Sequence, residues 1–510
     1  MPNQPIHANE SPPPAHQGAT VIPLQKVTDE LRARVASSAQ KTPTTDTETE
    51  VSLYEVRQKI YPRAVHGWFA QMRWGMVLFT QLLYYGLAWL PWNDRQAILF
   101  DLAQRKFYIF GLVLWPQDFF YLTILLILSA LGLFLFTAMA GRLFCGYACP
   151  QTVYTEIFMW IERKVEGERA ARQKLDEGGW SIRKLGLKST KFALWGLLAF
   201  WTGFTFVGYF TPIQTLFGEV FLPGHDKLGA WEFFWLFFYA GFTFLQAGFM
   251  REQVCKYMCP YARFQSAMFD KDTLVITYDQ ARGEPRGARN KKADPAQLGL
   301  GSCVDCGICV QVCPTGIDIR KGLQYECIGC AACIDACDQV MDKMNYSRGL
   351  IRYATENGLK NHWDRAQMLR RIFRPRVLVY GGILLSILLI SLASLAFRTP
   401  FKVDVIRDRG SLGREISEGY IENVYRLQLM NTDERGHTFT LSAHGLDGIK
   451  IVSDTAIPLA ATETRMVVVK VQVPPNLGKP GPNPIYFDIS RAEFPDTRVA
   501  EKAVFHIPRR

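Results

Sequence analysis

Five long apolar segments constrain this chain most, because each is close to the roughly 20 residues that a helix needs to cross a bilayer. They run approximately over residues 68–90, 120–140, 192–210, 231–249 and 377–397. The last contains ILLSILLISLASLAF, which has neither charge nor amphipathic pattern, so a buried helix of a soluble protein is a poor alternative. We therefore expect an α-helical integral membrane protein with about five spans. A shorter apolar stretch, residues 107–114, is predicted to be interfacial.

The distribution of basic residues predicts the orientation of the spans. Lysine and arginine are frequent in the loop after the second segment and again between residues 251 and 376, whereas the loop after the third segment carries one lysine. Because basic loops stay on the cytoplasmic side, the N-terminus and residues 251–376 are predicted to be cytoplasmic and the C-terminal region external. This topology explains the net charge of +11 without a nucleic-acid partner. Residues 1–50 lack an apolar run, so we expect a disordered tail and no cleavable signal peptide.

Eight of the twelve cysteines lie in two copies of the pattern C-x2-C-x2-C-x3-C. Three thiolates at this spacing can bind three iron corners of a cubane cluster, and the fourth binds the other cluster in two-cluster ferredoxins. We therefore assign one [4Fe–4S] cluster to Cys303, Cys306, Cys309 and Cys337, and a second to Cys327, Cys330, Cys333 and Cys313. Structural zinc does not require a third cysteine in each run, disulfide frameworks belong to secreted domains, and no CxxC precedes a histidine as c-type haem requires.

The other four cysteines form an internal repeat, C-x3-C-P, at the cytoplasmic ends of the second and fourth segments. The first copy contributes Cys145 and Cys149, and the second contributes Cys255 and Cys259. Cysteines four residues apart share one face of a helix, and the following proline suits the first position of a new helix, whose N-terminus favours thiolate. Four soft thiolates suit Cu(I), iron or disulfide exchange. The alternative is that they are packing residues, but two matching copies beside two cluster motifs favour a redox or metal site.

Several other sites are not indicated by the sequence. The spans have no histidine in their interiors, which argues against a bis-histidine haem inside the membrane. Neither a GxGxxG turn after a strand nor a P-loop is present, so no nucleotide site is expected.

The C-terminal region changes character, because YIENVYRLQLMN and TRMVVVKVQVPP alternate apolar and polar residues between turn signals. This alternation predicts an immunoglobulin-like antiparallel β-sandwich. The predicted organisation is a cytoplasmic tail (1–50), a four-helix membrane domain with both CxxxCP motifs (51–270), a two-cluster ferredoxin-like domain (271–347), a basic linker (348–376), a fifth span (377–397) and an external β domain (398–510).

Longer strings indicate a family. KIYPRAVHGWF, RKFYIFGLVLWPQDF, RLFCGYACPQTVYTEIFMWIER, SRGLIRYATEN and the β tail together resemble the cytochrome c oxidase accessory proteins of the CcoG family, also called FixG or RdxA, within the wider group of polyferredoxin membrane proteins. The resemblance covers nearly everything from residue 54 to the C-terminus. It implies a bacterial inner-membrane protein with a periplasmic β domain, which serves assembly of the cbb-type oxidase and reduces Cu(II) to Cu(I).

Two functional hypotheses follow from this resemblance. In the first, the chain is a cupric reductase with Cys145, Cys149, Cys255 and Cys259 as its catalytic residues, fed by a quinol or a cytoplasmic reductant and delivering copper to a chaperone. In the second, it is an electron-transfer or scaffold subunit, similar to NapH and NosR, that passes electrons to a partner protein. Its expected partners are membrane lipid and the assembly factors of the oxidase.

Overall fold

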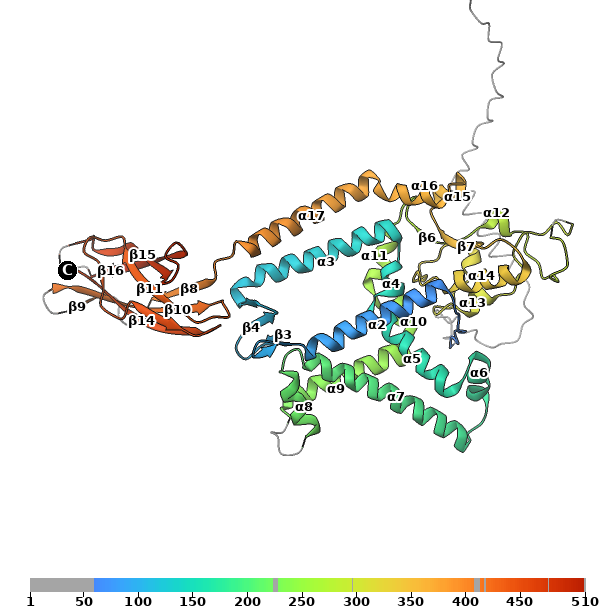
Figure 1. Ribbon diagram of the computed structural model, residues 1–510, viewed down its shortest axis with the longest axis horizontal. Helices are drawn as coiled ribbons and strands as arrows, with labels where there is room; N and C mark the ends of the chain where they lie inside the picture. The colour runs from blue at the N-terminus through green and yellow to red at the C-terminus, as the bar shows by residue number, and fades with distance from the viewer. Residues whose placement is uncertain are drawn as a thin grey trace, which may run out of the picture. The chain divides into compact units, whose positions relative to one another are not determined.

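Five long helices occupy the five apolar segments (Figure 1). The computed structural model describes residues 59–222, 228–295, 297–407, 413–416, 419–475 and 477–508, so the predicted tail, residues 1–50, lies outside the described residues. The helices are α2 (Trp68–Trp89), α3 (Phe119–Ala140), α7 (Ile182–Val207), α9 (Ala230–Leu245) and α17 (Pro375–Ala396). α7 begins well before residue 192, because the side chain of Ser181 caps it by accepting from the Lys184 N–H.

Four helical stretches among the described residues are long and apolar enough to cross a membrane. In the stretch Pro116–Ala140 the most apolar window has a hydropathy of 2.5 and is 0% buried, so its side chains need lipid around them. α2 has the required length but carries Gln71, Arg73 and Gln81, which make it less apolar. By length and composition, therefore, four helical stretches rather than the predicted five qualify as candidate spans, and α2 is the predicted span that does not qualify.

Shorter helices follow the spans. After α3 come α4 (Leu143–Tyr147), α5 (Pro150–Glu166) and α6 (Arg169–Glu177), and after α7 comes α8 (Ile213–Phe221). α9 continues into two wider π-helical turns, Gln246–Met250 and Val254–Met258, on either side of α10 (Arg251–Gln253), and α11 (Pro260–Met268) follows. Both C-x3-C-P motifs therefore lie where a long helix has given way to shorter ones.

The stretch predicted to be interfacial, residues 107–114, forms strands. β3 (Ile98–Asp101), β4 (Lys106–Ile109) and β5 (Leu112–Leu114) make a three-stranded antiparallel sheet after a hairpin of β1 (Pro91–Trp92) and β2 (Arg95–Gln96). Its buried side chains Leu99, Tyr108 and Val113 pack with Met430 of the C-terminal domain. These strands could not be predicted from the stretch alone, because they are stabilised by burial against a domain that is distant in sequence.

The ferredoxin-like part is enclosed by two strands that lie on either side of the cysteine runs in sequence. β6 (Val275–Tyr278) pairs antiparallel with β7 (Ile351–Ala354), and between them lie α12 (Gln280–Gly283), α13 (Ile308–Gln311) and α14 (Ala332–Met344). β7 falls within the predicted linker, residues 348–376, so the fold extends past residue 347. The rest of that linker holds α15 (Glu356–Lys360) and α16 (Arg365–Arg370).

The C-terminal region is a sandwich of two antiparallel sheets, as its alternating pattern predicted. One sheet holds β8 (Phe401–Arg407), β9 (Arg414–Glu415), β10 (Ile421–Asn431), β12 (Lys450–Ile451) and β14 (Thr464–Val473). The other holds β11 (His437–His444), β13 (Ala456–Leu459), β15 (Gly481–Arg491) and β16 (Arg498–Ile507). Along β15 buried and exposed residues alternate through the strand, which places one face in the core between the sheets.

The first turn of α2 is held by the ferredoxin-like part. The carboxylate of Asp335, on α14, accepts hydrogen bonds from the backbone N–H of Ala70 (2.8 Å) and of Phe69 (3.3 Å). The N-cap position of α2 is Gly67, which has no side chain to cap the helix itself. Asp335 is 6% exposed and therefore serves as a cap from another element.

Removing this cap should weaken the junction. We expect Asp335→Ala to lower the free energy of unfolding by about 1–2 kcal/mol, because two buried backbone donors lose their acceptor. Asp335→Asn keeps one acceptor oxygen and should lose less. Hydrogen exchange at the Ala70 amide of the detergent-solubilised protein measures the effect, and unchanged protection of that amide in Asp335→Ala would contradict it.

Candidate functional site

Two cavities gather the eight cysteines of the repeated runs. The first is lined by Cys303, Cys306, Cys309 and Cys337, and the second by Cys313, Cys327, Cys330 and Cys333. Each cavity thus combines three cysteines of one run with the fourth cysteine of the other, the exchange found in two-cluster ferredoxins. Cys309 borders the second cavity as well, so the two cavities share a wall. This donor set fits two cubane clusters.

The backbone of the two runs curls in the same way around the second cysteine of each. Asp305 and Gly307 flank it in the first run with φ of 50° and 64°, and Gly329 and Ala331 flank it in the second with φ of 69° and 59°. A non-glycine residue in this left-handed region costs about 1–2 kcal/mol. The gain is that successive N–H groups form a concavity suited to an anionic group. Gly307 and Ala331 are also the N-caps of α13 and α14.

The two cavities differ in charge. The second is lined, apart from its cysteines, mainly by isoleucine and alanine, whereas the first includes Arg320. Arg320 forms a hydrogen-bonded ion pair with Asp318 at 2.8 Å, and this hydrogen bond holds the pKa of the Asp318 carboxyl below its usual value. The cysteine spacing gave no sign of Arg320, which reaches the cavity from the loop after the first run.

Burial raises the pKa of several thiols in these cavities, to about 11 for Cys309 and about 12 for Cys327 and Cys337. Iron binds the thiolate, so loading of the cavities must release protons, and metal binding is coupled to pH. Neighbouring thiols raise these pKa values further, because a thiolate disfavours negative charge on the groups around it.

The proline after each CxxxCP motif is the first residue of a helix, as predicted. Cys149 is the N-cap of α5 and Cys259 the N-cap of α11, both with extended backbone. The expectation that each pair shares a helix face is wrong, because the helix breaks between the two cysteines. Cys145 lies in α4 and Cys255 in the π-helical turn Val254–Met258, each ahead of the break.

The expectation that Cys149 is a stabilised thiolate is also wrong. Burial raises the pKa of Cys149, and backbone hydrogen bonds from Gln151 and Thr152 at the start of α5 offset this only in part. Burial likewise raises the pKa of Cys145 to about 11, against a hydrogen bond with the buried Gln265, whose Nε2 lies 3.5 Å from Sγ. At neutral pH both are thiols unless a metal binds them.

The CxxxCP cysteines adjoin the second cavity. Cys145 and Cys255 pack against one buried cluster that contains Cys330 and Ile328. The backbones approach closely here, since a Cβ added to Gly146 would lie 2.8 Å from the Cα of Cys330. The four thiols also lie near one another, because a charge on Cys145, Cys149 or Cys259 would raise the pKa of Cys255. The structure therefore brings together two copies of a motif that are more than a hundred residues apart.

No group of three or more His, Cys, Asp or Glu side chains in the described part of the chain converges closely enough to hold a single metal ion. This does not bear on a cubane cluster, which spreads its ligands over four iron corners. For the CxxxCP cysteines it means that they do not form a closed single-ion site in this arrangement.

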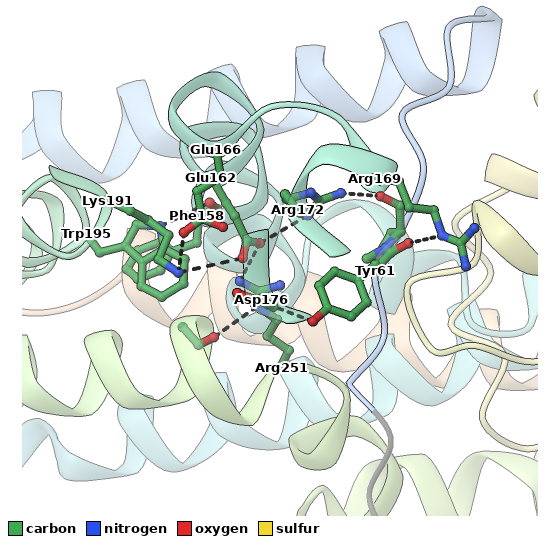
Figure 2. Close-up of polar contacts among 12 residues, drawn as sticks. Tyr61, Phe158, Glu162, Glu166, Arg169, Arg172, Asp176, Lys191, Trp195 and Arg251 are labelled. Carbon is green, nitrogen blue, oxygen red and sulfur yellow. Dashed lines mark hydrogen bonds and ion pairs between the residues drawn. The ribbon is translucent and has the colours of Figure 1, made fainter. Parts of the chain in front are cut away.

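A buried network of charges joins α5 to α6, α7 and α10 (Figure 2). Glu162 on α5, which is 1% exposed, pairs with Arg172 on α6 (3.2 Å) and with Arg251 on α10 (2.9 Å). One turn further along α5, Glu166 pairs with Lys191 (2.9 Å), whose ammonium lies over the ring of Trp195. In the sequence, these basic residues predicted only the orientation of the spans and not a buried network.

The network holds two segments in place. Arg172 donates to the carbonyl of Pro62 (2.7 Å), and the neighbouring Arg169 donates to that of Tyr61 (2.9 Å), which fixes the chain ahead of α2. Arg251 belongs to the helical turn that leads into Cys255. Burial raises the pKa of Glu162, but the charges of Arg251 and Arg172 outweigh it, so that this pKa lies below its usual value.

Comparison with known families matches three parts of the chain. A 4Fe-4S dicluster domain matches residues 250–356, and a 4Fe-4S binding domain matches residues 122–167, which include the first CxxxCP motif. The IG-like fold at the C-terminus of FixG matches residues 391–508. The chain therefore has iron–sulfur domains and an immunoglobulin-like C-terminal domain.

Three curated proteins are similar over most of the chain. The nitrogen fixation protein FixG of Rhizobium meliloti is 40% identical over 77% of this chain and 80% of its own length. The protein RdxA of Cereibacter sphaeroides is 38% identical over 83% of this chain and 91% of its own length. The protein RdxB of the same organism is 41% identical over 78% of this chain and 84% of its own length.

Filling the close approach at Gly146 should destabilise the protein. We expect Gly146→Ala to cost about 1–3 kcal/mol, because its Cβ would meet the backbone of Cys330, which has no flexible end to move away. Thermal unfolding and iron content of the detergent-solubilised protein measure this. In the matched control Gly186→Ala, on α7, nothing lies within 4 Å of the added Cβ. A control that melts lower than Gly146→Ala would contradict the prediction.

The Glu162 network should make stability depend on pH. Since its folded pKa lies below the unfolded value, Glu162 contributes stability above the unfolded pKa and loses it as pH falls through the folded pKa. We expect Glu162→Gln to cost about 3–5 kcal/mol at neutral pH, and the difference from the intact protein to shrink in acid. Unfolding measured from neutral to acid pH checks this. The exposed Glu168→Gln is the control, and a difference that grows in acid would refute the linkage.

Proposed function

The chain belongs to the FixG family, and on that premise we propose that this iron–sulfur oxidoreductase reduces Cu(II) to Cu(I) for assembly of a cbb-type cytochrome oxidase. An electron-transfer role follows from the iron–sulfur domains and from the FixG and RdxA relatives. The copper substrate, the oxidase and the roles of individual cysteines belong to the proposal.

The proposed ligands of the two clusters are the two sets of cysteines that line the two cavities. Bound [4Fe–4S] clusters would supply one-electron transfer at this place. The chain holds each set with a curled backbone and shields every cysteine but Cys306 at least partly from water, and the backbone of α4 packs against that of Cys330.

The observation that carries the copper proposal is the packing of Cys145 and Cys255 against the buried cluster that contains Cys330. Soft thiols beside an electron-transfer site can accept a copper ion at the point where an electron arrives, and thiolate favours Cu(I) over Cu(II). Each Cu(II) takes up one electron.

We further propose that the ferredoxin-like part is cytoplasmic and the β domain periplasmic, in a bacterial inner membrane. The basic loops support this orientation. α2 supports it as a fifth span, because its first turn is capped by Asp335 and its other end leads to the β3–β5 sheet, which packs on the β domain. The β domain is the proposed docking surface for assembly factors or a copper chaperone.

A second candidate is an electron carrier that reduces a partner protein and has no substrate of its own. It is favoured by the lack of a convergent single-ion metal site among the described residues. In that case the CxxxCP cysteines pack the junction between the helices and the ferredoxin-like part, and the β domain holds the electron acceptor.

Copper reduction by the isolated protein distinguishes the two candidates. We expect anaerobic, dithionite-reduced protein, freed of excess dithionite, to produce Cu(I), detected with a Cu(I)-specific chelator. A variant with Cys145, Cys149, Cys255 and Cys259 changed to alanine should fall roughly tenfold or more, since the step loses its copper ligands. Visible and EPR spectra must first show that its clusters are retained. Equal rates would assign the reduction to the clusters themselves and favour the carrier.

A further inference from the structure

A cavity between α2, α5 and the chain ahead of α2 belongs to none of the sites described so far. Its volume is about 200 Å³. Small-molecule sites usually span about 300–1,000 Å³, so this cavity has room for a headgroup rather than for a whole drug-sized ligand. The segment from Pro62 to Gly67 forms one wall, and the bonds from Arg172 and Arg169 to the carbonyls of Pro62 and Tyr61 hold this wall in place (Figure 2).

Two buried arginines line this cavity with a hydrogen-bond donor to spare. Arg73 is 7% exposed and Arg172 is 3% exposed, and the Nε of each has no hydrogen-bond partner among the described residues. The other nitrogens of Arg73 make only long contacts, 3.4 Å to the carbonyl of Cys330 and 3.5 Å to Glu156. Buried donors without acceptors are costly, so the site is built to receive a ligand with acceptor oxygens.

The other charged residues that line the cavity also favour a ligand with acceptor oxygens. Arg63, His66 and Arg163 also line the cavity, and Glu156 is the one carboxylate among its lining residues. Glu156 is half-buried, and its carboxylate can accept a hydrogen bond from a ligand hydroxyl. The ligand should therefore present both acceptor oxygens for guanidinium groups and a donor for this carboxylate.

One side of the cavity is aromatic and leads toward lipid. Trp74 and Trp160 line it edge to face, with ring centroids 6.3 Å apart. Trp160 is 41% exposed, and beyond Trp74 the surface of α2 presents exposed Leu78 and Leu82. Tryptophan pairs at this depth suit a flat ring that arrives from the membrane.

The opposite side of the cavity is formed by the cysteine runs. Pro314 and Ala332 line it, and each is the direct sequence neighbour of a cysteine of the second cavity, Cys313 or Cys333. A second hollow shares Arg73 and Glu156 with the first and reaches Cys330 and Cys255. A ligand in the first cavity would contact residues that directly adjoin, in sequence, the cysteines of the proposed electron-transfer site.

We propose that this cavity binds the headgroup of a membrane quinol, with its oxygens between Arg73 and Glu156 and its ring against Trp74 and Trp160. The proposal rests on the electron-transfer role and adds a donor to it. A quinol that becomes a quinone releases two electrons and two protons. The clusters that the two cysteine sets would hold could each take one of the electrons, and Glu156 and His66 are the cavity residues whose side chains can accept the protons. A phosphate headgroup would satisfy the arginines but would leave the carboxylate and the ring pair unused.

Binding is tested with the full chain, its clusters loaded, in phosphatidylcholine nanodiscs. Under anaerobic conditions, with the protein kept reduced by dithionite so that no turnover occurs, calorimetry follows the binding of decylubiquinol. We expect saturable binding to the intact protein. Arg73→Gln should bind roughly tenfold more weakly, the loss expected for one hydrogen bond to a charged group. Lys164→Gln, an exposed change of the same charge on α5, should bind as the intact protein does.

Glu156→Gln separates a quinol from an anion. A quinol hydroxyl donates to the carboxylate, so this variant should weaken decylubiquinol binding, whereas an anionic headgroup should bind more tightly once the negative charge is removed. The same titrations in nanodiscs that contain phosphatidylglycerol test the anion directly. Displacement of decylubiquinol by this lipid, together with tighter lipid retention in Glu156→Gln, would overturn the proposal in favour of a lipid headgroup site.

Failure of this proposal is distinguishable from failure of the proposed function. Copper reduction by the intact protein uses dithionite as its donor and does not need the cavity. If copper is reduced but decylubiquinol does not bind, the quinol site is wrong and the reductase stands. If decylubiquinol binds with the expected response to both variants but copper is not reduced, the quinol site stands and the electrons have another acceptor.

Discussion

The distance between the two groups of cysteines is set by a contact of backbone on backbone. Gly146 of α4 lies against Cys330, and Gly329 lies against the carbonyl of Arg142 in return, where an added Cβ would be 3.0 Å from that oxygen. Two glycines facing each other leave no room for side chains or for water between them. The hydroxyl of Tyr353 donates to the carbonyl of Gly329 (2.6 Å) and holds the loop there. Any electron that passes between the cysteine groups crosses this narrow contact.

The charged network on α5 also helps to position the helices around the cysteines. Burial of a carboxylate such as Glu162 is unfavourable unless cations surround it, and here those cations come from α6, α7 and α10. Because Arg172 also lines the proposed quinol cavity and Arg251 leads into the turn that holds Cys255, the network fixes both places together. The helices on which the cysteines depend are thus positioned by electrostatics as well as by apolar packing.

The sequence predicted those features that depend on spacing within one segment. The helical segments, the two cysteine runs, the β-sandwich and the N-cap positions of Cys149 and Cys259 could be read from local pattern. What it missed depends on distant partners. The pairing of β6 with β7 and the placement of Arg73 beside Cys330 arise from packing across more than seventy residues. The raised pKa of Cys149 belongs to the same class, since burial opposed the expected effect of the helix end.

The cap on α2 has a consequence for the order in which this protein can mature. The amide of Ala70 and its acceptor on Asp335 are separated by 265 residues, so the ribosome must finish the ferredoxin-like part long after α2 has left it. The same holds for the proposed clusters, each of which takes cysteines from both runs. α2 must therefore form with its first turn uncapped, and delivery of the proposed clusters has to wait for the second run to emerge. Metal insertion and closure of the junction then become a single late event in biogenesis.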